Sequence, residues 1–178
     1  MFTTIVITMP TFIDAEAERI VRLLCSGVTL VHIRKPVAEY DEVERLVCSV
    51  PAEWRGRLVL HDHFSLAQRY SLYGVHLNRR NPQPPAGWKG CVSRSCHSLD
   101  EVVRYKDACD YLSLSPIFDS ISKQGYRSAF TQDDICSAVS DGIIDSKVYA
   151  LGGVTFAALP ALKALGFGGA MMLGDAWR

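Results

Sequence analysis

The sequence lacks a surplus of charge of either sign, because 19 lysines and arginines stand against 19 aspartates and glutamates in 178 residues. Binding along a nucleic acid needs an excess of cationic side chains to neutralise phosphates. We therefore expect no nucleic-acid partner. A site for one small anion remains compatible with this composition.

Long apolar runs and paired cysteines are also lacking. No run approaches the roughly 18 residues of a membrane span, and residues 1–8 have neither the charged start nor the apolar length of a signal peptide. We expect no membrane contact and a cytoplasmic location. None of the six cysteines belongs to a C-x-x-C pair, so we expect free thiols; they are Cys25, Cys48, Cys91, Cys96, Cys109 and Cys136.

Short β-branched runs alternate with helical patterns along the whole chain, which is typical of a parallel sheet with crossover helices. The expected strands are 3–8, 28–34, 57–62, 74–77, 90–93, 111–115, 147–151 and 168–173. The expected helices are 13–26, 39–50, 65–72, one from residue 98, one from residue 131, and 155–165. Eight strands at about 22 residues per unit predict a compact α/β fold, a (β/α)8 TIM barrel in one domain over residues 1–178. The alternative is an open doubly wound sheet, whose common forms have five or six strands.

Two helices of an ideal barrel are not expected. Residues 78–87 contain three prolines and cannot form a regular helix, so a loop replaces the fourth crossover helix. The last expected strand ends at residue 173. The eighth helix is therefore missing or truncated to residues 175–178. The uncovered side of the barrel indicates a shortened chain or a homodimer partner.

Polar residues and glycines occupy the carboxyl ends of the expected strands, the rim that carries the active site in barrel enzymes. Gly152 and Gly153, together with Gly174, follow the last two strands and favour a phosphate site, although glycines of tight turns fit the same pattern. The cations expected at this rim are Arg34, Lys35 and Lys123, although a lone Lys35 fits a solvated surface residue better.

Histidines and one aspartate complete the candidate residues. Asp62 follows a strand, where it fits a Mg²⁺ ligand or a helix cap equally well. His61 and His63 would share a strand face, but no third zinc ligand is apparent. His97 precedes a helix and is the candidate acid/base, whereas His32 and His76 fit structural histidines.

Six segments in succession resemble the thiamine phosphate synthase and thiazole tautomerase superfamily, over nearly the whole chain. The segments are VHIRK at 31–35, LHDH at 60–63, GVHL at 74–77, SCHS at 95–98, DY at 110–111 leading to SPIF at 115–118 and SISK at 120–123, and ALGGV at 150–154. The resemblance implies a (β/α)8 barrel whose partners are small phosphorylated thiazole and pyrimidine substrates.

Residue roles follow from the same resemblance. Arg34 and Lys123 would hold pyrophosphate, Ser95 would contact it, and Asp62 would bind Mg²⁺. Ser120 and Ser122 stand where threonines line the family's loop, and Gly153 would cradle the thiazole phosphate. Substrate contacts extend to His32, Lys35, His61, His76, Gly152 and Gly174.

The sequence departs from the family at four positions. Pro36 stands where the family has a lysine two places after the arginine, and Lys35 lies one place earlier. His32 replaces a pyrimidine-contacting glutamine, His61 replaces an asparagine, and Asn81 stands where the second metal carboxylate is expected. One carboxylate with an amide binds Mg²⁺ less well than two carboxylates. Synthase chemistry is our first expectation. The alternatives are a thiazole tautomerase acting through His97 and a catalytically silent barrel that binds thiamine intermediates.

Overall fold

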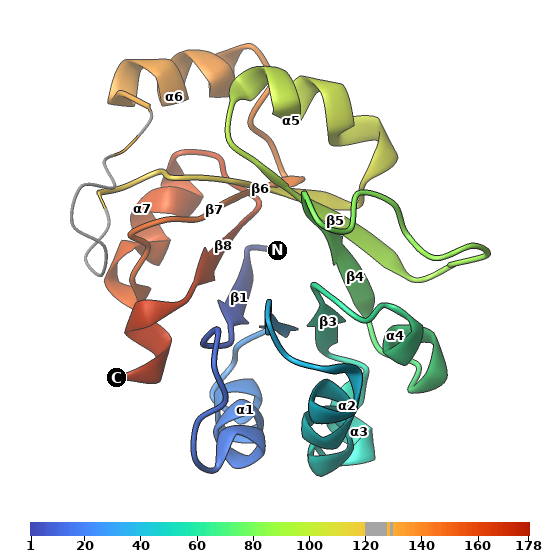
Figure 1. The fold of residues 1–178 in the computed structure, drawn as a ribbon. Coiled ribbons are helices and arrows are strands. Elements are labelled where there is room, and N and C mark those ends of the chain that lie inside the picture. The colour runs from blue at the N-terminus through green and yellow to red at the C-terminus, as the bar shows by residue number, and fades with distance from the viewer. Residues whose placement is uncertain (120–127, 129) are drawn as a thin grey trace. The chain divides into compact units, whose positions relative to one another are not determined.

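Eight parallel strands form the sheet of the computed structural model, which describes residues 1–119, 128 and 130–178 (Figure 1). Their order is that of a closed barrel, β1-β2-β3-β4-β5-β6-β7-β8, which confirms the expected (β/α)8 class. The strands are β1 (Thr3–Ile7), β2 (Leu30–Ile33), β3 (Leu58–Leu60), β4 (Gly74–Leu77), β5 (Cys91–Cys96), β6 (Tyr111–Leu114), β7 (Val148–Ala150) and β8 (Gly169–Met172).

Helices follow most of the strands. The α-helices are α1 (Glu16–Cys25), α2 (Tyr40–Ser49), α3 (Ala52–Arg55), α4 (Ser65–Arg69), α5 (Leu99–Tyr105), α6 (Gln132–Ser140) and α7 (Leu159–Ala164). Three short 3-10 helices are η1 (Lys106–Ala108), η2 (Phe156–Ala158) and η3 (Gly174–Trp177). Within the described residues, no helix is long and apolar enough to cross a membrane.

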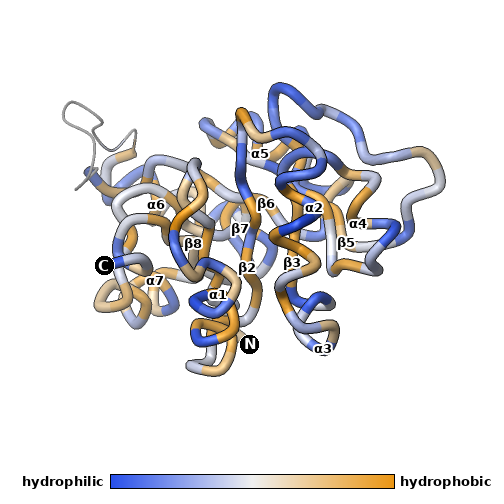
Figure 2. The backbone as a smooth tube through the Cα atoms, turned by 60° about the horizontal axis from the view of Figure 1, so that its bottom comes forward, coloured by the Kyte–Doolittle hydropathy of each residue, from blue (hydrophilic) through white to orange (hydrophobic). Residues whose placement is uncertain are grey.

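The chain divides into two compact units, which we call the N-terminal unit (residues 5–92) and the C-terminal unit (residues 1–4 and 93–178). In the N-terminal unit, β1 pairs with β2, β2 with β3, and β3 with β4. In the C-terminal unit, β5 pairs with β6, β6 with β7, and β7 with β8. Figure 2 shows hydrophobic residues along strands such as β2 and β3, and stretches of hydrophilic residues in the connecting segments.

Helix α1 shows how the sequence builds the N-terminal unit. Ala17, Ile20 and Leu24 recur at helical spacing and are buried, so one face of the helix packs inward. The helix starts at Glu16, three residues later than expected, because Ala15 has a left-handed φ of 53° that a helix cannot include. It ends before Gly27, whose φ of 103° suits glycine.

Several other boundaries differ from the expected ones. Helix α4 ends at Arg69 rather than at residue 72, β2 starts at Leu30 rather than at residue 28, and β3 covers three of its six expected residues. Residues 78–90 contain no helix, as the prolines indicate, and only η3 follows β8. Helix α3 was not expected, because its four residues are too few to show a period. Strand β5 runs to Cys96 rather than to residue 93, and the last expected helix opens as the 3-10 turn η2.

Candidate active site

Arg34 follows β2 directly, and its backbone is held by a buried threonine. The Arg34 N–H donates to Thr8 Oγ1 over 2.9 Å, and the Thr8 hydroxyl donates to the Arg34 carbonyl over 3.4 Å. The side chain of Arg34 is half-buried. A fixed backbone with a partly accessible guanidinium suits bidentate binding of a phosphate group.

Lys35 lies inside the N-terminal unit with 2% of its surface exposed. Its ammonium donates to both oxygens of Glu16, at 2.7 and 2.9 Å, and to the carbonyls of Met9 and Thr11. Burial lowers the pKa of Lys35, and the Glu16 carboxylate opposes that shift. These contacts favour a structural role for Lys35, which holds the segment between β1 and α1 in place. They do not support the substrate contact that we expected of it.

Asp62 follows β3 and is bound by two side chains from the loop after β4. Arg80 donates to both Asp62 oxygens over 3.0 to 3.1 Å, and Asn81 Nδ2 donates to Oδ1 over 2.9 Å. Asp62 does not cap α4, whose N-cap is Phe64. Its carboxylate is therefore already neutralised by a guanidinium.

Three histidines from β2, β4 and the end of β3 lie together in the N-terminal unit. His32 Nδ1 is 2.9 Å from His61 Nε2, and the His61 and His76 rings stack with centroids 4.2 Å apart. All three side chains are buried. Burial is the largest cause that lowers the pKa of His32 and of His61 well below 6.5, with neighbouring positive charge adding to the shift. The two rings are therefore neutral at pH 7.

The pairing of His61 with His63 considered for zinc is wrong. Strand β3 ends at Leu60, and His63 has a left-handed φ of 52°. Its Nε2 lies 2.8 Å from the Ala38 carbonyl, away from His61. The true neighbours of His61 come from the adjacent strands.

His97 occupies an exposed position at the start of α5 in the C-terminal unit. Its Nδ1 is 3.2 Å from both the carbonyl and the hydroxyl oxygen of Ser115. Because a carbonyl only accepts, this contact favours the tautomer with the proton on Nδ1 and leaves Nε2 as the basic nitrogen. The His97 backbone N–H donates to Glu101, while Ser98 caps the helix.

Close packing against the segment after β6 is sufficient to explain why glycine occupies positions 152 and 153. Both have left-handed φ values, and a Cβ on Gly153 would lie 2.4 Å from the Asp119 carbonyl oxygen. The segment after β6 closes onto this turn through a hydrogen bond from Phe118 N–H to the Gly152 carbonyl. A phosphate role for these glycines, and for Gly174 at the start of η3, stays a prediction.

The strands β5 and β6 carry further polar residues that face one another in register. Ser95 lies opposite Ser113, whose fully buried hydroxyl has no hydrogen-bond partner among the described residues. Sequence reasoning missed Ser113, although its alternation with Tyr111 and Ser115 along one strand face would have found it.

Cys96 is an unreactive thiol, because burial raises its pKa to about 12. All six cysteines are free, as expected. Ser120, Ser122 and Lys123 lie outside the described residues.

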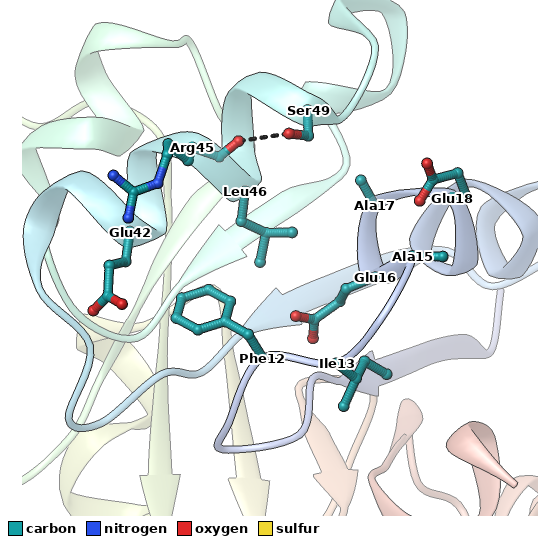
Figure 3. A pocket seen from close by; sticks show the side chains of 10 residues that line it. All are labelled: Phe12, Ile13, Ala15, Glu16, Ala17, Glu18, Glu42, Arg45, Leu46 and Ser49. Carbon is teal, nitrogen blue, oxygen red and sulfur yellow. Dashed lines mark hydrogen bonds between the residues drawn. The ribbon is translucent and has the colours of Figure 1, made fainter.

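A hollow of about 390 Å³ lies between the start of α1 and α2 (Figure 3). Phe12, Ile13 and Leu46 form its apolar part, and the acidic side chains of Glu18 and Glu42 lie at its edge. None of the predicted site residues lines this hollow. A functional role for the predicted residues at the carboxyl ends of the strands stays a prediction.

An α/β barrel with ionisable side chains at the carboxyl ends of its strands has the general arrangement of barrel enzymes. Residues 4–175 match the thiamine monophosphate synthase family, and the chain belongs to that family. A thiamine-phosphate synthase of Bacteroides thetaiotaomicron is 25% identical over 173 residues, covering 90% of this chain and 83% of the relative. The thiamine-phosphate synthase of Salmonella typhimurium is 27% identical over 164 residues, covering 86% and 76%.

Solved structures agree with this assignment. The crystal structure of a thiamine phosphate pyrophosphorylase from Bacteroides thetaiotaomicron is 41% identical with a TM-score of 0.89, covering 99% of this chain and 85% of that one. A thiamine phosphate pyrophosphorylase from Pyrococcus furiosus, 19% identical with a TM-score of 0.76 over 98% of this chain and 90% of its own, shares the fold.

Proposed function

We propose that the protein is a thiamine-phosphate synthase, which joins a hydroxymethylpyrimidine pyrophosphate to a thiazole phosphate. The observation that carries the proposal is the family match over residues 4–175, together with relatives and a solved structure that bear this activity in their names. The tautomerase alternative has no such support among these relatives.

In this reaction the bond between the pyrimidine methylene carbon and the pyrophosphate oxygen breaks, and the oxygen keeps the electron pair. The thiazole nitrogen then donates its lone pair to the methylene carbon. Negative charge grows on the departing pyrophosphate, so fixed cations near it lower the barrier. We assign this contact to Arg34, whose backbone N–H donates to Thr8 Oγ1 and whose side chain is half-buried.

Mg²⁺ assists the leaving group in the resembled family, but the residues around Asp62 do not fit it. Asp62 is the one carboxylate at this position, and Arg80 and Asn81 already donate to its oxygens. In the part of the chain that the structure describes, Asp62 belongs to no cluster of three potential metal ligands. We therefore derive no step through Mg²⁺. Arg34 would supply positive charge to the leaving group, whereas the charge of Arg80 is balanced by Asp62.

The test is product formation from the two phosphorylated substrates, followed by chromatography of thiamine phosphate and by pyrophosphate release. Arg34→Gln should lower the rate by about 10²- to 10³-fold, the loss typical of one donor to a developing anion. Arg19→Gln, which changes an exposed arginine of α1, should leave the rate unchanged. Wild-type protein that forms no product from these substrates would refute the proposed function.

A further inference from the structure

The three buried histidines of the N-terminal unit, which the family resemblance makes substrate contacts, also offer a metal-ligand set to which the proposed reaction assigns no step. One ring nitrogen from each of His32, His61 and His76 lies within 4.8 Å of the other two. His32 is 5.1 Å from His61 and 5.2 Å from His76 between ring centroids. The described residues contain no other cluster of three such groups.

Strand register brings these side chains together. Leu60 pairs with Val75, so the next position places His61 opposite His76. His32 pairs with Val59 on the same face, two residues before His61. The three imidazoles therefore come from neighbouring strands on one side of the sheet.

The backbone of His61 is fixed by hydrogen bonds on both sides. Its N–H donates to the Ile33 carbonyl over 3.1 Å. Its carbonyl accepts from the side-chain amides of Asn78, over 2.7 Å, and Asn81, over 3.1 Å. Ligands held by surrounding hydrogen bonds bind a metal with less loss of conformational freedom.

His32 Nδ1 and His61 Nε2 lie 2.9 Å apart, so these two rings form a hydrogen bond without a metal, and that contact has to open before both nitrogens can bind an ion. Burial lowers the pKa of His32 and His61, which keeps them in the neutral form that coordinates a metal.

We propose that His32, His61 and His76 bind one divalent transition-metal ion of the zinc type, with a water molecule or an anion as fourth ligand. Tetrahedral bonds of about 2.0–2.1 Å place ligand nitrogens roughly 3.3 Å apart. The 2.9 Å His32–His61 contact therefore opens slightly on binding, and His76 moves closer. Imidazole ligands suit zinc, cobalt or nickel and do not suit Mg²⁺, which prefers oxygen.

The experiment titrates chelator-treated protein with Zn²⁺ by calorimetry and with Co²⁺ by visible absorption. We expect one ion per chain and a Co²⁺ spectrum of tetrahedral nitrogen and oxygen ligation without thiolate bands, which excludes binding by the exposed cysteines. His32→Gln and His61→Asn should each weaken binding by more than the roughly 10- to 100-fold that follows loss of an outer-shell partner. His63→Gln, which removes a neighbouring histidine outside the cluster, should bind as the wild type does.

A second measurement covers variants that fail to fold. In wild-type protein with ¹⁵N-labelled histidine, Zn²⁺ should shift the imidazole signals of three of the five histidines, those of the cluster. Shifts at His63 or His97 alone, or no stoichiometric binding, would overturn the proposal. These readouts do not depend on synthase activity, so failure of one proposal does not imply failure of the other.

Discussion

Acid should destabilise this protein through His32 and His61 before its carboxylates are protonated. Both rings are buried and their pKa values lie well below 6.5, so they stay neutral in the folded state. In the unfolded chain they take up protons as pH falls through about 6.5. The unfolded state then binds more protons, so the free energy of unfolding decreases below pH 6.5 and is insensitive to these groups above it.

The magnitude follows from proton linkage. With an unfolded pKa near 6.5 and both rings neutral when folded, the free energy of unfolding decreases by up to about 2.4 kcal/mol between pH 6 and pH 5. His32→Gln removes one of these groups and should reduce that decrease by up to about 1.2 kcal/mol.

Urea unfolding between pH 5 and pH 7.5, with chelator present to keep metal out, measures the effect. The comparison of wild type with His32→Gln cancels the contribution of other titrating groups. Equal pH dependence in these two proteins would refute the assignment of His32 as a buried neutral ring that becomes protonated on unfolding.

Three further predictions concern stability and are measured by urea unfolding at pH 7. Lys35→Met leaves Glu16 buried without its cation and should destabilise by about 3–5 kcal/mol, whereas Lys35→Met with Glu16→Leu should recover most of that loss. Gly153→Ala should destabilise by at least about 1–3 kcal/mol because of its left-handed φ and its contact with Asp119, while Gly56→Ala, with open space around it, should not. Ser98→Ala removes the N-cap of α5 and should lower the free energy of unfolding of the protein by about 1 kcal/mol. An unchanged urea midpoint would show that the Glu101 carboxylate alone is enough to cap the helix.

Local signals in the sequence predicted much of the fold. The strand β4 has the expected bounds, and Ser98 and Thr131 are the N-caps of α5 and α6, because a cap depends on residues three positions away. The barrel class followed from the alternation of strands and helices, which the whole chain repeats.

The partners of charged residues could not be predicted in the same way. Lys35 meets Glu16 across 19 positions, and Asp62 meets Arg80 across 18. Such pairs depend on how neighbouring segments lie, which no local period encodes. The histidine cluster needed the register of three strands, so from the sequence His32 and His76 fitted structural histidines and His61 was paired with His63.

The departure from the resembled family at Asn81 leaves the net charge around Asp62 unchanged. Two carboxylates with one Mg²⁺ carry no net charge, and one carboxylate with one guanidinium carries none either. Replacement of the second carboxylate by Asn81, with Arg80 bound to Asp62, therefore keeps the local charge balance without an ion. The positive charge is then fixed covalently to the loop after β4. Among the described residues, the one cluster of three potential metal ligands consists of imidazoles and does not include Asp62, so metal binding there is separate from neutralisation of Asp62.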